Sequence, residues 1–241
     1  MASVRDHYDG HLGPVYGWMI GDYDEARETA RAELRAAGIA EGAGRFAVDL
    51  GAGPGAHAIA LAEAGFSVTA IDTCAQLLDE LRAHGGDRVR CVHDDLLNVA
   101  RQCASAQDVI VCMGDTLTHL DSLQSVERLF EAISVTLRPG GVFLATFRDY
   151  EAAPLEGAGR FIPVRQDDCR LLTCFLEYQD TTVTVYDLLH ERRHAGWTLR
   201  VSSYSKLRLS PRWVRSTLNR LGFIATLDAG PRGMTLLVAT R

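Results

Sequence analysis

The sequence contains no apolar run long enough to cross a membrane and no apolar core near its N-terminus. A membrane helix needs about 20 predominantly apolar residues, and a secretory signal needs an apolar segment of its own. The opening stretch, MASVRDHYDGHLG, has neither. We therefore expect a cytoplasmic protein that does not bind a membrane.

Metal-binding and redox motifs are also missing. The six cysteines are scattered, without a CxxC pair and without a histidine at metal-ligand spacing. Because such cysteines are usually buried as reduced thiols, we expect no metal site. The chain also lacks internal repeats and low-complexity tracts, which excludes a solenoid architecture.

Positive charge is in deficit, since 31 Asp and Glu residues outnumber 25 Lys and Arg residues and give a net charge of -6. A surface that gathers nucleic-acid phosphates is usually basic, so we expect a small-molecule partner and no nucleic acid. The rest of the composition is that of a globular protein: 47% hydrophobic and 23% charged residues in a chain of 241, enough for one large domain.

Helix and strand patterns alternate from about residue 43 to residue 150, which is typical of a parallel sheet covered by helices. Short apolar runs predict strands at 46–50, 66–71, 89–92, 109–113 and 142–147. Helix-forming stretches predict helices at 57–64, 75–83 and 122–136, and LRPGG at 137–141 predicts a turn. We therefore predict a doubly wound, Rossmann-like α/β fold with a mostly parallel sheet of seven strands.

The flanking segments predict two additions to this core. Residues 1–42 predict an N-terminal arm, with a helix at 24–37, that covers the site. Long β-rich runs at 170–178, 182–190 and 197–209 predict an antiparallel insertion at 160–209, which is either a lid or the surface of a homodimer. A helix at 212–221 and strands at 223–227 and 234–240 return to the core, which comprises 43–159 and 210–241.

A glycine-rich loop follows the first predicted strand. Gly51, Gly53 and Gly55 lie where an open α/β sheet binds nucleotide-like ligands, outside the carboxyl ends of its strands. Asp49 lies inside the apolar strand just before this loop. A carboxylate at that place repels a pyrophosphate but suits a ligand that carries an amino group, such as S-adenosylmethionine.

Acidic residues also follow the next two strands. Asp72 ends the second strand, where one carboxylate pairs well with two ribose hydroxyls. Asp95, followed by Leu96, is suited to accept a hydrogen bond from an adenine amino group, and the neighbouring Asp94 is its rival for this role. A solvated carboxylate is an equally good interpretation of either acid alone.

These motifs together resemble those of the class I S-adenosylmethionine-dependent methyltransferases. The resemblance rests on VDLGAGPG at 48–55, Asp72, Asp95 with Leu96, and LRPGG at 137–141. It implies S-adenosylmethionine as cofactor and S-adenosylhomocysteine as product. The implied cofactor-binding residues belong to the loop that binds the methionine part, to the acid that binds the ribose and to the surroundings of the adenine. They are Asp49, Gly51, Ala52, Gly53, Gly55, His57, Asp72, Thr73, Leu77, Asp94, Asp95, Leu96, Cys112, Met113 and Gly114. His57 departs from the family pattern. It caps the helix, touches the cofactor carboxylate or faces solvent.

The segment after the fourth strand is the best candidate for binding the substrate that accepts the methyl group. CMGDTLTHL at 112–120 resembles the Gly-Asn-Ser-x-x-His-Leu of glycine and sarcosine N-methyltransferases, and FRDY at 147–150 resembles their His-Arg-Asn-Tyr. By this resemblance Arg148 anchors an acidic or carbonyl-bearing substrate. The alternative for Arg148 is a structural ion pair with Asp149 or Glu151.

The resemblance also marks two differences in the acceptor pocket, since Met19 replaces a tyrosine and Asp115 replaces an asparagine. An added carboxylate favours a cationic amine or a polarised heterocycle over glycine. We expect Asp115 to orient the acceptor and His119, if a base is needed, to serve as that base. The expected substrate-binding residues are Tyr16, Trp18, Met19, Arg148, Tyr150 and Tyr204.

The function predicted from the sequence is methyl transfer to a small molecule, most directly to the nitrogen of an amine or heterocycle. Transfer to oxygen or sulfur is the next alternative. A nicotinamide-dependent oxidoreductase is a further one, because GAGPGA at 51–56 is close to the dinucleotide fingerprint and Asp72 lies about 20 residues on. The last alternative is a protein that binds the cofactor without catalysing a reaction.

Overall fold

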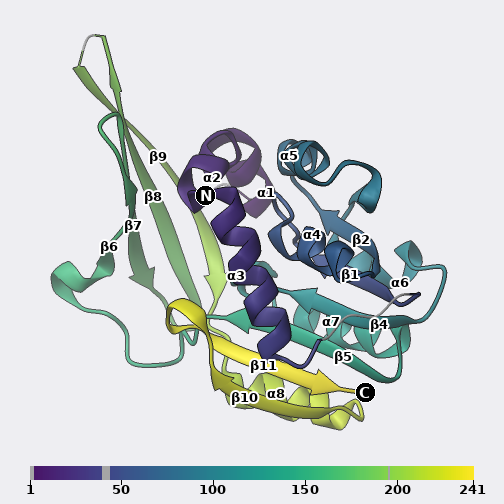
Figure 1. Ribbon diagram of the computed structural model, residues 1–241. Helices are drawn as coiled ribbons and strands as arrows, with labels where there is room; N and C mark the ends of the chain where they lie inside the picture. Colours follow the sequence, from purple (N-terminus) through teal and green to yellow (C-terminus); the bar gives the residue numbers. More distant parts are fainter. Residues whose placement is uncertain (1–2, 40–43, 195) are drawn as a thin grey trace.

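The computed structural model describes residues 3–39, 44–194 and 196–241. In these residues the strands form two sheets (Figure 1). Sheet A has seven strands in the order β10-β11-β5-β4-β1-β2-β3, and sheet B has four in the order β6-β7-β8-β9. The predicted seven-stranded α/β sheet with an antiparallel insertion is confirmed.

Sheet A carries the site at its carboxyl edge. Its strands are β1 (Phe46–Leu50), β2 (Ser67–Asp72), β3 (Val89–His93), β4 (Gln107–Cys112), β5 (Leu137–Phe147), β10 (Ile224–Ala229) and β11 (Thr235–Thr240). The first five run parallel, and β11 pairs antiparallel with both β5 and β10. The chain order reverses between β1 and β4, and this switch point is where open α/β sheets bind their ligands.

Helices cover both faces of sheet A because successive strand residues point to opposite sides. Ala47 packs with α3 (Tyr23–Ala36), α4 (Ala56–Glu63) and α5 (Ala75–Gly85). Val48 packs on the other face with α6 (Val99–Gln102), α7 (Leu123–Thr136) and α8 (Pro211–Arg220). Serine side chains cap the first turns of α7 and α8. Short 3-10 helices connect the elements: η2 (Gly86–Arg88), η3 (Leu96–Asn98), η4 (Thr116–His119), η5 (Gly157–Arg160) and η6 (Pro231–Gly233).

The turn predicted at 137–141 lies inside β5, so that boundary was wrong. The pairing of β4 with β5 shifts from Gln107 opposite Leu137 to Val109 opposite Val142, and the residues between leave the register. Gly140, at φ +75°, donates its backbone N–H to the Arg241 carbonyl at 2.8 Å. The LRPGG stretch is therefore a bulge that hydrogen bonds hold within the strand.

Sheet B consists of β6 (Phe161–Gln166), β7 (Arg170–Tyr178), β8 (Thr182–Arg193) and β9 (Gly196–Leu207), all antiparallel. The sequence had not predicted β6. The hairpin of β8 and β9 projects beyond the rest of the molecule (Figure 1). Nearly all of the β-rich insertion is therefore a single sheet beside the core.

The N-terminal arm is one helical run made of α1 (Val4–His7), the π-helix η1 (Tyr8–Leu12) and α2 (Gly13–Ile20). It lies between sheet B and the end of sheet A that carries α5 (Figure 1). Leu12 and Val15 pack against Leu172 and Leu189 of sheet B. On the other side a Cβ on Gly13 would lie 3.4 Å from Cys74, so the arm also touches the α5 region.

Candidate cofactor and acceptor site

The glycine loop after β1 packs tightly against η4. Gly51, Gly53 and Gly55 have φ values of +68°, +54° and +90°, which side chains rarely adopt. A Cβ on Gly51 would lie 2.4 Å from the Cγ2 atom of Thr116 in η4. The loop that is expected to hold the cofactor therefore adjoins the segment that is expected to hold the acceptor.

Asp49 is buried at 2% exposure beneath this loop. Burial, together with the charge of Asp72, raises its pKa to about 6, against the opposing effects of His57 and of a hydrogen bond from the Ala58 backbone. No cationic side chain forms an ion pair with Asp49 in the part of the chain that the structure describes. The carboxylate is thus suited to stabilise a positively charged ligand group.

Asp72 at the end of β2 is tied to the loop. Its Oδ2 atom accepts a hydrogen bond from the Gly53 backbone and its Oδ1 atom one from the Cys74 backbone, both at 2.8 Å. Burial raises its pKa in spite of these bonds. Each carboxylate oxygen has a second lone pair, so the fixed carboxylate retains capacity to accept from two hydroxyls.

The two acidic residues after β3 form hydrogen bonds with residues close to them in the sequence. The Asp94 carboxylate accepts hydrogen bonds from the side chains of Asn98 at 2.8 Å and Gln102 at 2.6 Å, which lower its pKa. Asp95 is exposed and caps η3 by accepting from the Leu97 backbone at 2.8 Å. Asp95 is thus the more accessible of the two for an adenine amino group, with Leu96 beside it.

The remaining predicted cofactor residues occupy different surroundings. His57 pairs with Glu33 of α3, Nε2 to Oε2 at 2.8 Å, so its ring is committed to that contact. The Thr73 carbonyl is 2.8 Å from Nε2 of His93, and Leu77 is fully buried. Ala52 lies within the glycine loop. At the end of β4 the chain passes from the buried Cys112 and Met113 to the exposed Gly114, whose backbone donates to Thr146.

Asp115 is the centre of the acceptor side. It adopts φ +76°, a strained value for a residue other than glycine, and is 4% exposed. Its Oδ1 atom accepts from the Arg148 backbone at 2.8 Å, and its Oδ2 atom accepts from Lys206 Nζ at 2.6 Å and from the Tyr150 hydroxyl at 3.3 Å. Burial opposes ionisation, but the Lys206 charge keeps the pKa of Asp115 below its usual value.

Lys206 was not predicted as a site residue. It comes from β9 and is 8% exposed, and the neighbouring Asp115 charge raises its pKa despite burial. One signal in the sequence was available, because Lys206 is the single lysine among the 25 basic residues. Asp115 is therefore neutralised inside the protein, and it no longer favours a cationic acceptor.

His119 is held neutral beside this ion pair. Burial, and then the charge of Lys206, lower its pKa to about 3. Its Nε2 atom is buried and has no hydrogen-bond partner among the described residues. The ring lies 5.5 Å from Tyr204 and 5.8 Å from Tyr8. Since a neutral imidazole can accept a hydrogen bond, His119 is suited to accept one from a ligand.

A second buried polar pair links the arm to sheet B and was also missed. His7 is fully buried, with Nε2 2.9 Å from Asp187 Oδ2 and Nδ1 2.8 Å from the Ser202 hydroxyl. Its ring packs against the Tyr204 ring at a tilt of 33°, with the centroids 4.2 Å apart. His7 of the arm thus helps to position the Tyr204 ring, which His119 also contacts.

The three predicted residues of the arm lie in different surroundings. The Tyr16 ring lies 3.8 Å from the position that a Cβ on Gly53 would take, beside the glycine loop. Trp18 instead donates from Nε1 to Asp167 at 2.5 Å, and Met19 packs in an apolar cluster with Leu172. The structure thus brings Tyr16, but not Trp18, to the loop.

The other three predicted substrate-binding residues also differ in their surroundings. Tyr150 and Tyr204 are buried at the Asp115 and Lys206 pair. Arg148 has an exposed side chain whose guanidinium donates to the Arg232 carbonyl at 3.3 Å, and no ion pair with Asp149 or Glu151 forms in the described part of the chain. Arg148 therefore contributes its backbone to Asp115 rather than its charge.

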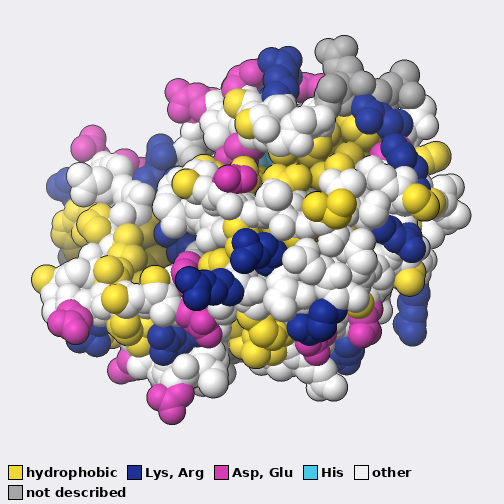
Figure 2. All heavy atoms as spheres, turned by 90° about the horizontal axis from the view of Figure 1, so that it is seen from below, with side chains coloured by type: hydrophobic (Ala, Val, Ile, Leu, Met, Phe, Trp, Pro, Cys, Tyr) yellow, Lys and Arg dark blue, Asp and Glu magenta, His cyan; other side chains and the backbone are white. Residues whose placement is uncertain are grey.

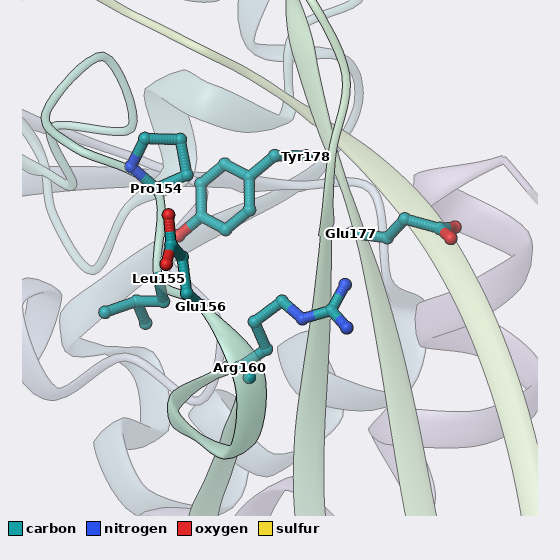
Figure 3. Close-up of a pocket in the computed structure, with 7 residues that line it drawn as sticks. Pro154, Leu155, Glu156, Arg160, Glu177 and Tyr178 are labelled. Carbon is teal, nitrogen blue, oxygen red and sulfur yellow. The ribbon is translucent and has the colours of Figure 1, made fainter.

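A surface cavity of about 410 Å³ adjoins these residues, since Tyr178 in its lining packs against the cluster that contains Tyr150 and Tyr204 (Figure 3). The segment from Pro154 to Arg160 forms one side of it, and Glu177 and Tyr178 of β7 form the other. It contains none of the predicted site residues.

Within the described residues, no helix has the length and hydrophobicity needed to span a membrane, and no cluster of His, Cys, Asp and Glu is suited to a metal ion.

Comparison with known proteins finds methyltransferases. Residues 47–141 match the family model described as a methyltransferase domain. A glycine/sarcosine N-methyltransferase of Aphanothece halophytica is 28% identical over 157 residues, which cover 63% of this chain and 59% of that protein. The chain thus spans less than two thirds of this curated relative. The family match leaves no support for the nicotinamide alternative.

Two solved structures show the same fold over most of the chain. An amino pentose methyltransferase of Micromonospora echinaspora, solved with bound S-adenosylmethionine, has a TM-score of 0.76 at 19% identity and covers 96% of this chain and 97% of its own. A sugar N-methyltransferase of a Streptoalloteichus species has a TM-score of 0.72 at 15% identity and covers 92% and 88%.

Proposed function

From the premise that the chain belongs to the class I S-adenosylmethionine-dependent methyltransferases, we propose that it methylates an amine nitrogen of a small molecule. The observation that carries this proposal is the unpartnered Nε2 atom of His119, which is held neutral on η4, the 3-10 helix whose Thr116 packs against the glycine loop. A neutral imidazole accepts an N–H of an amine and leaves the nitrogen lone pair free to react.

The cofactor edge fits S-adenosylmethionine. Asp49 is a buried carboxylate without a cationic partner among the described residues, as the amino group of the cofactor requires. Asp72 is fixed by two backbone hydrogen bonds and would hold the ribose. Asp95 and Leu96 would contact adenine. The cofactor supplies the methyl group as a sulfonium, so the protein's main contribution is to align it with the acceptor.

The acceptor is proposed to be an amine because the curated relative is named for N-methylation of glycine and sarcosine and a structural neighbour for N-methylation of a sugar. Asp115 and Lys206 neutralise one another at 2.6 Å, so no free carboxylate stabilises an ammonium there. The amine is therefore bound in its neutral, reactive form. His119, with a pKa near 3, orients the N–H group but does not retain its proton at neutral pH.

Calorimetry with S-adenosylhomocysteine tests the cofactor half. We expect Asp72→Ala to weaken binding by one to two orders of magnitude, roughly the loss of two charge-assisted hydrogen bonds. Asp180→Ala, which removes an exposed carboxylate from a turn of sheet B, is the control and should bind normally. Absence of binding by the unmodified protein would refute the proposed function.

Methyl transfer tests the acceptor half. The protein should release S-adenosylhomocysteine with one or more primary amines drawn from amino acids, amino sugars and amino alcohols, and not with matched alcohols or thiols. His119→Phe keeps the aromatic packing against Tyr204 and Tyr8 but removes the acceptor atom. We expect this variant to bind S-adenosylhomocysteine normally and to lose at least about tenfold in kcat/KM, since a hydrogen bond in the reacting complex is lost. Transfer to alcohols alone would contradict the assignment to nitrogen.

A further inference from the structure

The single lysine of the chain lies at the proposed acceptor site. Of the 25 Lys and Arg residues, 24 are arginine, and the remaining one is Lys206 in β9. It lies at the acceptor side of the site, 91 residues from its ion-pair partner Asp115. That partner immediately precedes Thr116, the residue packed against Gly51 of the cofactor loop. Lys206 therefore lies close to where methyl donor and acceptor are expected to meet.

The Lys206 ammonium uses one of its three donors. Nζ lies 2.6 Å from Asp115 Oδ2 and is flanked by the rings of Tyr150 and Tyr204, 6.0 Å and 5.8 Å from their centroids. No other side chain or carbonyl in the described residues accepts a hydrogen bond from it. About a tenth of the side-chain surface stays accessible. Because an unsatisfied buried donor is costly, the two remaining N–H groups need a partner from a ligand or from water.

The adjoining polar groups are unpartnered too. Tyr204 is 5% exposed, and its hydroxyl makes no hydrogen bond to any described residue. His119, whose ring lies 5.5 Å from the Tyr204 ring, has a buried Nε2 atom without a partner. Together with Lys206 these residues provide two unused ammonium donors, one hydroxyl that donates and accepts, and one imidazole acceptor.

We propose that Lys206 determines which acceptor is methylated, by donating a hydrogen bond to an uncharged oxygen next to the accepting nitrogen. This inference rests on the proposed N-methyltransferase function. It assigns the acceptor to the 1,2-amino alcohols, in which a neutral amine has a hydroxyl group on the adjacent carbon, rather than to the amino acids.

Charge balance favours a hydroxyl over a carboxylate. The Lys206 charge is already matched by Asp115, and Asp187 adds another buried carboxylate on the neighbouring strand, paired with His7. A substrate carboxylate would bring a further negative charge to this buried region, and the one buried lysine there is already paired with Asp115. A hydroxyl accepts from Lys206 and donates its own proton to the Tyr204 oxygen, while His119 accepts the N–H of the amine.

The lysine itself provides the probe. In protein labelled only at lysine, the Nζ and Cε signals belong to Lys206, because the chain has no other lysine. The complex with S-adenosylhomocysteine would be titrated with trans-2-aminocyclohexanol and, as the matched control, with cyclohexylamine. We expect the amino alcohol to shift the lysine signal and to bind at least about tenfold more tightly, the effect of one hydrogen bond to a charged group. Equal affinity of the two amines, including no binding by either, would overturn the proposal.

Two variants separate a role in binding from a role as counter-ion. Lys206→Met leaves Asp115 buried and unpaired, so it should lower the melting temperature as well as abolish the preference for the amino alcohol. Lys206→Met combined with Asp115→Asn removes both charges. We expect this double variant to recover most of the melting temperature but not the preference, measured by calorimetry of the two amines. A preference that returns in the double variant would show that Lys206 only balances Asp115, and would overturn the proposal.

The failure of this inference is distinguishable from failure of the proposed function. Binding of S-adenosylhomocysteine and methyl transfer to some amine report on the function alone. If glycine is methylated and trans-2-aminocyclohexanol is not preferred over cyclohexylamine, the N-methyltransferase assignment stands and the role of Lys206 falls.

Discussion

Three buried or nearly buried acids at the carboxyl edge of sheet A differ in the groups that surround them. Asp49 has no cationic partner among the described residues, and its pKa is raised to about 6. Asp72 is held by two backbone N–H groups. Asp115 is paired with Lys206, which lowers its pKa. The same side chain is thus suited to bind a cation, to accept hydrogen bonds from hydroxyl groups, or to form half of a neutral pair, according to its neighbours.

The raised pKa of Asp49 predicts a pH dependence of cofactor binding. Above pH 6 the carboxyl group is ionised and attracts the ligand's amino group, and below pH 6 it becomes protonated and that attraction is lost. We expect the affinity for S-adenosylhomocysteine to fall by up to about tenfold per pH unit below pH 6. Calorimetry from pH 5 to 8 measures it, with circular dichroism to verify that the protein remains folded.

Asp49→Asn is the matched control for this dependence. The variant should bind more weakly at pH 7.5 and show a nearly flat profile between pH 5 and 7, because the titrating group is gone. A profile in the variant as steep as that of the unmodified protein would assign the dependence to another group, and Asp49 would lose its role.

At the scale of elements, the N-terminal arm joins the two sheets. Its helix α1 brings His7 to sheet B, the π-helical turn η1 carries Tyr8 and Leu12, and α2 brings Tyr16 to the glycine loop. π-helical turns are uncommon and often occur at functional sites. We expect the arm to cover both ligands, so its attachment to sheet B should govern access to the site.

His7→Ala tests the attachment of the arm. The variant loses the contacts of the imidazole with Asp187, Ser202 and the Tyr204 ring, and leaves Asp187 with the Cys174 thiol at 2.8 Å. We expect a loss of about 2–4 kcal/mol in the free energy of unfolding, as for other buried hydrogen-bonded groups. Amide hydrogens of residues 4–20 should exchange faster. His194→Ala, at the exposed tip of the β8–β9 hairpin, should change neither quantity.

At the scale of the whole molecule, sheet B has one buried face and one exposed face. The arm and the buried pairs of the site lie on one side. On the other, large apolar side chains alternate along the edge strand β9: Trp197, Leu199 and Val201, each at least half exposed. Phe161 on β6 is also half exposed, and Figure 2 shows hydrophobic side chains on the lobe formed by sheet B. Such a surface is more typical of an interface than of free solvent.

We therefore expect a homodimer through the outer face of sheet B, with the same patch on both subunits. Analytical ultracentrifugation at micromolar concentration should give about twice the chain mass of 26.4 kDa. Leu199→Glu with Val201→Glu should give monomers that still bind S-adenosylhomocysteine, because both residues face away from the site. A monomeric unmodified protein would contradict this use of the surface and leave a lid as the alternative.

The elements that the sequence predicted well are those with a strong local pattern. The strand, glycine loop and helix around Asp49 were located to within one or two residues, as was the acid at the end of β2. β6 was missed because its residues are exposed and only pairing with β7 holds them in a strand. The LRPGG turn was misplaced because hydrogen bonds from the chain end draw it into β5.

The elements around the proposed cofactor site were predictable from the order of residues along the chain, because a strand, its turn and the following helix are fixed by neighbours a few positions apart. The acceptor side was decided by tertiary structure. Lys206 meets Asp115 across 91 residues and His7 meets Asp187 across 180. Which distant side chains meet depends on how sheet B and the arm pack against the core, and that packing changes the charge of the pocket from an unpaired carboxylate to a neutral ion pair with unused donors.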